Sequence, residues 1–142
     1  MESVCQICAN SGPPPRRGSA SKRHLRGTFA LVQAFDVARA AERLAGQGGG
    51  YEVVHESPGL EIGVYVLMAP EPDRQSPHAF DEVYVVLDGE GDIEVEGELR
   101  RIAEGEAVFV AARADHRFSA YENLSLLVVF NGPHSASKRG EP

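Results

Sequence analysis

Between Tyr51 and Phe130 the chain is a series of short segments in which apolar residues occupy every second position. Residues 92–99 are the clearest case, because four acidic residues alternate with nonpolar positions, of which Ile93, Val95 and Leu99 are expected to face the core. Side chains point to opposite faces along a β-strand, so this alternation predicts one buried and one solvated face. Residues 61–68 alternate in the same way. Because turn-forming residues recur every ~8–12 positions, the pattern predicts an all-β sandwich or barrel.

Further strands are expected at 82–87, 107–110, 116–118 and 124–130. The segment 82–87 is largely apolar on both faces, which is typical of a strand packed on two sides. The sequence DGEG that follows predicts a turn at 88–91. An eight-stranded jelly roll, which closes most of its sheet edges, fits a domain of this size.

One short helix is expected before the strands. Asp36 is a suitable N-cap, because its carboxylate can accept a hydrogen bond from the first helical turn. Val37, Ala40 and Leu44 would then share one face of the helix. The glycine-rich stretch 46–50 would end it.

The composition changes along the chain and predicts three regions. Residues 1–27 are rich in Ser, Gly, Pro and Arg and contain little to bury, so we expect a disordered basic leader. Residues 28–132 would form one domain and residues 133–142 a flexible tail. Cys5 and Cys8 form an isolated C-x-x-C in the leader. Since the chain has no other cysteine, they do not complete a zinc ribbon.

The charge and hydropathy exclude two function classes. The net charge is −7 although the leader is basic, so the remainder of the chain is strongly acidic. Nucleic-acid binding depends on cationic contacts with phosphates and is not expected. No apolar run reaches the ~18 residues of a membrane helix, and the basic N-terminus lacks the apolar core of a signal peptide. We expect a cytoplasmic protein that binds neither nucleic acid nor membranes.

His78 and Glu82 are the first candidate site residues. They are spaced four apart in a segment that reads as strand, so both would point to the same face. Their neighbours on that face are largely apolar, and a buried imidazole and carboxylate need a compensating partner. A metal ion is one such partner. His116 belongs to another strand and joins them only if the fold brings it there.

The stretch PHAFDEVYVVLDGEG at 77–91 resembles the first motif of the cupin family, G-x5-H-x-H-x3,4-E-x6-G. His78 is in register with the second histidine of that motif, Glu82 with its glutamate and Gly89 with its final glycine.

The stretch GEAVFVAARADHRFSA at 105–120 is similar to the second cupin motif, G-x5-P-x-G-x2-H-x3-N. Gly105 and His116 are in register with its glycine and histidine. Fifteen residues separate Gly89 from Gly105, which is the short spacing of compact single-domain cupins.

The resemblance implies a cupin-type jelly-roll barrel, or double-stranded β-helix, with a short N-terminal helix and one divalent metal ion. The ligands it implies are His78, Glu82 and His116. Fe, Mn, Zn and Ni all accept imidazole and carboxylate ligands, so the metal stays open. The first motif histidine of the family is Ser76 here, which removes one of the four family ligands. The alternatives for the vacant position are a water held by Ser76, the side chain of Gln75 and that of Asp81.

The resemblance implies a protein that acts on a small organic molecule inside the barrel, with dioxygenase- or isomerase-like chemistry and with unknown catalytic residues. The alternative is a non-catalytic small-molecule-binding or sensor cupin with a degenerate site, in which His78 and Glu82 pair with each other. Small cupins often dimerise, and the strand 82–87 suits a homodimer interface.

The other histidines and the aromatic residues are expected to be structural. His55 and His134 would be hydrogen-bonded surface or core residues, and His24 lies in the leader. Four aromatic residues are assigned to the core rather than to substrate binding: Phe80, Tyr84, Phe109 and Phe118.

Overall fold

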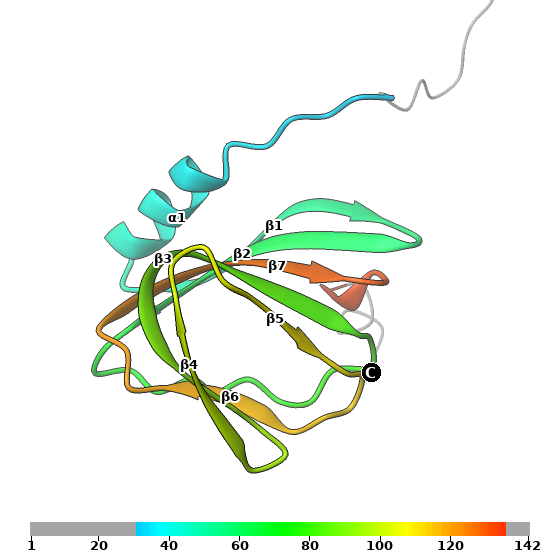
Figure 1. The fold of residues 1–142 in the computed structure, drawn as a ribbon. Coiled ribbons are helices and arrows are strands. Elements are labelled where there is room, and N and C mark those ends of the chain that lie inside the picture. The colour runs from blue at the N-terminus through cyan, green and yellow to red at the C-terminus, as the bar shows by residue number, and fades with distance from the viewer. Residues whose placement is uncertain (1–30, 136–142) are drawn as a thin grey trace, which may run out of the picture. The chain divides into compact units, whose positions relative to one another are not determined.

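The structure is a computed structural model that describes residues 31–135 (Figure 1). Residues 34–135 belong to one compact unit, in which antiparallel strands form a barrel. The predicted leader, residues 1–27 with Cys5, Cys8 and His24, lies outside the described residues. No helix among residues 31–135 is long and apolar enough to cross a membrane.

The described residues contain one helix and seven strands. In chain order these are α1 (Val37–Gly46), β1 (Gly50–Ser57), β2 (Leu60–Met68), β3 (Glu82–Val95), β4 (Glu98–Ala103), β5 (Ala107–Val110), β6 (His116–Ser119) and β7 (Asn123–Phe130). The prediction of an all-β barrel with a short N-terminal helix is confirmed.

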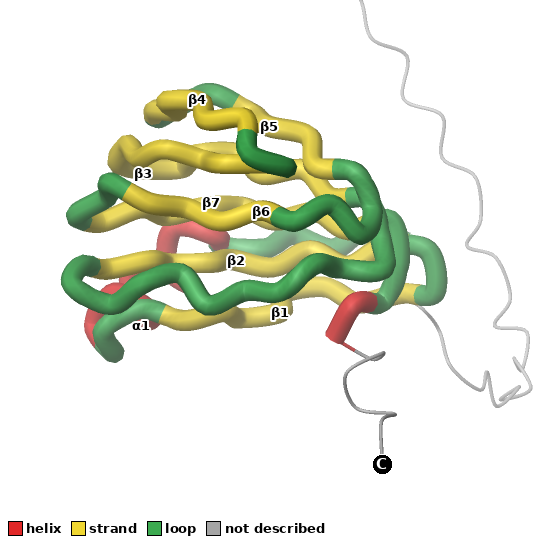
Figure 2. The backbone as a smooth tube through the Cα atoms, turned by 90° about the horizontal axis from the view of Figure 1, so that it is seen from below, coloured by secondary structure: helices red, strands yellow, loops and turns green. Residues whose placement is uncertain are grey.

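The helix α1 forms where the sequence predicts it. The side chain of Asp36 accepts a hydrogen bond of 3.0 Å from the backbone N–H of Arg39, which caps the first turn. Ala40 and Leu44 are buried against Val64 and Val66 of β2. In Figures 1 and 2 the helix lies beside β1 and β2, so it covers the outer face of this part of the sheet.

The strand β3 is central to the barrel, because a strand is hydrogen-bonded to each of its edges along most of its length. Its first part, from Glu82, pairs with β5 and β7. Its last part, up to Val95, pairs with β4 and β6. The strand therefore belongs to both sheets of the barrel.

The turn predicted at 88–91 is absent, and β3 runs straight through these residues. A β-bulge lies there instead, because the register with β7 shifts between Val86 and Asp88. The extra residue switches the inward-facing positions of β3 from even numbers, as in Val86, to odd numbers, as in Ile93. Two alternating patterns that are out of phase resemble two strands separated by a turn, which explains the wrong prediction.

Gly89 is required at this bulge. Its φ of +86° lies in the left-handed region, and a Cβ there would collide with the backbone carbonyl oxygen of Asn123 in β7. Only glycine allows the two strands to approach so closely at this point.

Two predicted core residues are instead exposed. β3 ends at Val95 in a two-residue turn at 96–97, where both residues have positive φ. Leu99 then pairs with Glu94 on the outward face, and 61% of its surface is exposed. Phe109 of β5 also points outward, with 63% of its surface exposed. Only Val108 and Val110 of this strand face the core.

The main core fills the barrel and is lined by alternate residues of β3, β6 and β7. Its buried members are Leu67, Tyr84, Val86, Ile93, Ile102, Val110, Phe118, Leu124, Leu126, Val128 and Phe130. The predicted tail begins at residue 133, but the chain stays packed on the barrel through residue 135. His134 is buried, and Ser135 donates two hydrogen bonds to Glu61 of β2. Residues 136–142 lie outside the described residues.

Candidate metal centre

His78, Glu82 and His116 come together at one end of the barrel. Glu82 is the first residue of β3, and His116 is the first residue of β6, opposite Val95 at the far end of β3. His78 lies in the loop 69–81 between β2 and β3, not in a strand as predicted. Pro77 precedes it, and proline cannot donate to a sheet ladder. The loop is held instead by the N–H of Arg113, which donates a 2.7 Å hydrogen bond to the carbonyl of His78.

The three side chains offer donor atoms that all lie within 4.8 Å of one another. Nε2 of His116 is 2.8 Å from Oε1 of Glu82, and Nε2 of His78 is 3.8 Å from Oε2 of the same carboxylate. All three residues are at least nine-tenths buried. The fold therefore brings His116 to the other two residues.

This donor set fits a divalent metal ion. Oε2 of Glu82 is buried and has no hydrogen-bond partner among the described residues, which is costly for a carboxylate oxygen unless a cation faces it. Two imidazoles and one carboxylate are ligands that Fe, Mn, Zn and Ni accept. The set is thus chemically suited to one ion.

The ring of His116 is oriented for metal binding. Its Nδ1 donates a 2.9 Å hydrogen bond to the carbonyl of Ala114, which leaves Nε2 facing the site. Burial lowers the pKa of His116, but the hydrogen bonds to Glu82 and Ala114 and the charges of Glu82 and Asp73 outweigh it, so the pKa is raised. Without a metal, the raised pKa and the contact with Glu82 favour a proton on Nε2 of His116.

Tyr84 and Gln75 extend the site beyond the three predicted residues. The hydroxyl of Tyr84 donates a 2.9 Å hydrogen bond to Oε1 of Gln75 and lies 3.1 Å from Nε2 of His116. Oε1 of Gln75 is also 3.4 Å from Nε2 of His78. Burial, and then the charge of Glu82, raises the pKa of Tyr84, so this side chain remains a neutral phenol.

Ser76 and Asp81 are the other two alternatives for the vacant ligand position. Ser76 is exposed. The carboxylate of Asp81 accepts a 2.8 Å hydrogen bond from the backbone N–H of Ala112, so it holds a neighbouring loop. Gln75 is the alternative whose side chain contacts a buried histidine, because its Oε1 lies 3.4 Å from Nε2 of His78.

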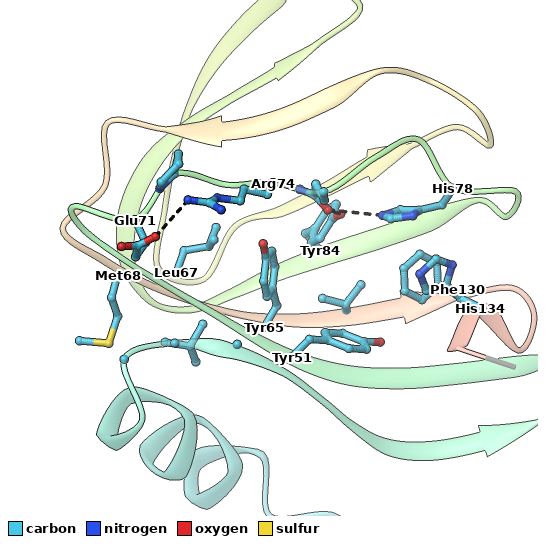
Figure 3. A pocket seen from close by; sticks show the side chains of 17 residues that line it. Tyr51, Tyr65, Leu67, Met68, Glu71, Arg74, His78, Tyr84, Phe130 and His134 are labelled. Carbon is cyan, nitrogen blue, oxygen red and sulfur yellow. Dashed lines mark hydrogen bonds and ion pairs between the residues drawn. The ribbon is translucent and has the colours of Figure 1, made fainter. Parts of the chain in front are cut away.

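A pocket of about 490 Å³ opens beside the centre. Figure 3 shows His78, Phe130 and His134 together at one end of it and Arg74 with Glu71 at the other. The ring of His134 lies 4.4 Å from that of His78, measured between centroids, and stacks on Phe130 at the same distance. The pocket thus combines apolar walls with a few polar side chains, which is typical of small-molecule sites.

Sequence reasoning missed His134 and Glu61 and assigned Tyr84 to the core alone. Tyr84 follows Glu82 by two positions in a strand, so alternation was a sufficient signal for its place beside the site. Glu61 is buried and accepts hydrogen bonds from Ser135 and, at 2.8 Å, from the hydroxyl of Tyr51. Gly63 makes room for the Tyr51 ring, because a Cβ there would collide with it. These contacts join distant segments and leave no local pattern.

Comparison with known proteins agrees with this architecture. The model of the cupin domain family matches residues 64–130. The uncharacterized protein SCO3923 of Streptomyces coelicolor is 41% identical over 96 residues, which are 67% of this chain and 90% of that protein.

Solved structures with a similar fold include a lyase and a cupin. The DMSP lyase DddQ of Ruegeria pomeroyi superposes with a TM-score of 0.55 and 25% identity over 59% of this chain, and the match spans 47% of that larger protein. An RmlC-like cupin of Shewanella frigidimarina superposes with a TM-score of 0.58 and 18% identity, covering 63% of this chain and 81% of that one. The barrel, the two motifs and these matches together show that the chain belongs to the cupin family.

Proposed function

We propose that this protein is a metal-dependent enzyme that transforms a small organic molecule by isomerase- or lyase-type proton transfer. One observation carries the proposal. The pocket that reaches the candidate ligand His78 is also lined by Tyr84 and His134, so groups that donate or accept protons lie beside the centre. Acid–base chemistry requires such groups within reach of the reacting atoms.

The metal would be held by His78, Glu82 and His116. When bound there, a divalent ion supplies Lewis acidity to an oxygen atom of the substrate. The three side chains leave coordination positions for such an oxygen, because divalent ions of this group commonly take more than three ligands.

The pocket residues suggest the remaining roles. His134 would accept or return a proton, since its ring lies against that of His78 and faces the pocket. Tyr84 is kept as a neutral phenol by burial, and because its proton is donated to Gln75, its oxygen would accept a hydrogen bond from the substrate. Arg74 lines the pocket and forms a 3.5 Å ion pair with Glu71 that is largely exposed, so it is available to attract an anionic group. A small carboxylate or carbonyl compound matches these features.

The comparisons support this choice of reaction class. One of the similar solved structures is named as a lyase, and its match to this chain reaches 25% identity. The specific substrate named there is not transferred to this chain, because the match spans less than half of that protein.

Two other functions remain as candidates. A dioxygenase would use the same ligands, since two histidines and one carboxylate suit iron(II) and oxygen. A non-catalytic binding or sensor protein with a degenerate centre is favoured by the close contact of His116 with Glu82, which lets the two side chains neutralise each other without metal. The position of Ser76, where the family has a histidine, also favours it.

Metal analysis of protein purified without added metal tests the centre. We expect about one ion per chain in the wild type and a loss of that ion in His78→Ala and in His116→Ala. His55→Ala is the matched control, because it removes a histidine outside the three-residue group. Little metal in the wild type, with no change in either site variant, would contradict the proposal and favour the degenerate centre.

The reaction class is tested by incubating the metal-loaded protein with a panel of small organic acids in D₂O. Isomerase or lyase chemistry predicts exchange of a carbon-bound proton for deuterium, detected by NMR, without oxygen consumption. Consumption of oxygen, measured with an electrode, would identify the dioxygenase instead. Ligand-induced stabilisation with neither change would support the binding protein.

We also propose a homodimer that uses the outer face of β3. Val83 lies between Phe109 of β5 and Val129 of β7 in the sheet, and all three side chains point outward. An apolar strip of this kind is a common feature of subunit interfaces.

A further inference from the structure

We propose that the amide oxygen of Gln75 is a fourth protein ligand of the metal and that Asp73 holds the amide in the ligating orientation. The inference rests on the proposed metal centre. It assigns the vacant family position to the residue next to Ser76, with a neutral oxygen in place of an imidazole nitrogen.

The position of the Gln75 side chain is the first argument. Ser76 is exposed, whereas the side chain of Gln75 is half-buried and lines the pocket beside His78. Its Oε1 lies 3.4 Å from Nε2 of His78 and 2.9 Å from the hydroxyl of Tyr84. That hydroxyl is in turn 3.1 Å from Nε2 of His116. The amide oxygen therefore faces the same space as the two imidazole nitrogens.

The hydrogen bonds of the amide define which of its ends faces the centre. Nε2 of Gln75 donates a 2.7 Å hydrogen bond to Oδ2 of Asp73, and a carboxylate only accepts. The other end must then be the oxygen, which agrees with the hydrogen bond that it receives from Tyr84. A carbonyl oxygen has a second lone pair, so it can accept from Tyr84 and bind a cation together.

Asp73 is fixed by more than the amide. Its Oδ1 accepts from the hydroxyl of Tyr65 at 2.8 Å and from the backbone N–H of Gln75 at 3.1 Å. Its Oδ2 also accepts from the backbone N–H of Phe118 in β6 at 2.8 Å. The carboxylate thus ties the loop 69–81 to strands on both sides, so Gln75 is positioned before any metal arrives.

The distances suit a shared ion. Two ligand atoms that are each about 2.1 Å from one ion lie about 3.0 Å apart at a right angle and about 3.4 Å apart at a tetrahedral angle. The Gln75–His78 and Glu82–His116 distances, 3.4 Å and 2.8 Å, are close to these values. Because carbonyl oxygen suits harder ions, this ligand would favour Mn²⁺ more than an imidazole at the same place.

The test measures metal binding by the full-length protein after chelator treatment. Mn²⁺ affinity is followed by electron paramagnetic resonance, and the coordination of Co²⁺ by its visible absorption. Gln75→Leu keeps a similar volume without a ligand atom, and we expect it to weaken Mn²⁺ binding about 10- to 100-fold and to change the Co²⁺ spectrum. Ser76→Ala is the control from the neighbouring position and should change neither.

Two further variants distinguish the loss of a ligand from a folding defect. Thermal unfolding shows whether each variant protein is folded. Gln75→Asn keeps a polar amide but is one methylene too short, so it should show the same loss as Gln75→Leu. Asp73→Asn keeps Gln75 but turns one of the two accepting oxygens into a donor, which then faces either Nε2 of Gln75 or the backbone N–H of Gln75. It should therefore weaken Mn²⁺ binding and change the Co²⁺ spectrum in protein that remains folded.

The outcomes separate this inference from the metal centre itself. Folded Gln75→Leu and Gln75→Asn proteins with wild-type Mn²⁺ affinity and Co²⁺ spectrum would overturn the role of Gln75, while loss of binding in His116→Ala would still support the centre. Absence of binding by the wild type would overturn both.

Discussion

Nε2 of His116 lies 2.8 Å from Oε1 of Glu82, and both side chains are almost fully buried. The two residues come from the beginnings of different strands, β6 and β3, so the contact depends on closure of the barrel. Without metal, a proton on Nε2 makes the contact between His116 and Glu82 an ion pair. When metal binds, that proton must leave, and the two donor atoms face the ion instead.

This contact predicts opposite pH dependences for stability and metal binding. Because the folded protein raises the pKa of His116 above 6.5, its ordinary value, the stabilisation is complete below that value and is lost as the pH rises through the raised pKa. Metal affinity should increase over the same range. Thermal unfolding in chelator, compared between wild type and His116→Gln, isolates the first effect, and a metal titration at each pH measures the second. A difference between the two proteins that grows with pH would contradict this assignment.

The two buried glutamates of the barrel should respond differently to the same change. Glu82→Gln removes the carboxylate of the centre, so we expect metal affinity to fall at least about tenfold. Glu61→Gln should retain metal and lose about 1–3 kcal/mol of stability, because one acceptor in its hydrogen bonds with Tyr51 and Ser135 becomes a donor. Metal content and chemical denaturation of both variants check this. Equal metal loss in both would show that Glu82 acts only through folding.

Gly89→Ala should be strongly destabilising. The alanine would combine a positive φ with a collision against the Asn123 carbonyl, and we expect a loss of more than about 2 kcal/mol. Gly97→Ala is the matched control, because Gly97 also has a positive φ but faces open space. Its expected cost is about 1 kcal/mol. Chemical denaturation measures both, and equal costs would argue against the close contact at the bulge.

Phe109→Glu tests the proposed dimer. The side chain is exposed in the single chain, so the change should alter the stability of the monomer by no more than about 0.5 kcal/mol. If the outer face of β3 is the interface, light scattering should detect a dimer for the wild type and a monomer for the variant. Leu99→Glu, on another exposed part of the barrel, should leave the dimer intact. A variant that remains dimeric would move the interface elsewhere.

Local patterns were sufficient to predict most of the strands. Alternation located β2, and the Asp36 cap with its apolar face located α1. The sequence was misleading where tertiary structure overrides the local pattern. Leu99 follows the alternation of β3 but lies beyond a turn, and the bulge in β3 resembles a loop.

The candidate site was predictable in part, through motif spacing and resemblance. His78 was assigned to a strand together with Glu82, although a loop holds it. The roles of Gln75 and Asp73 depend on side-chain hydrogen bonds that join the loop to β6 and to the barrel interior. His134 reaches the pocket from the end of the described chain. No periodicity in the sequence records these contacts.

The bulge in β3 also limits how this gene can change in length. A single-residue insertion or deletion between Glu82 and Val95 would turn every residue on one side of the change to the opposite face of the sheet. The exception is a change at the bulge, because the bulge already accommodates one extra residue. Elsewhere in the strand, such a change would turn either the Glu82 carboxylate or the Ile93 side chain out of the barrel. The turn at 96–97, beyond the end of the strand, has no such constraint. Length variation among relatives is therefore expected at that turn and not within the strand.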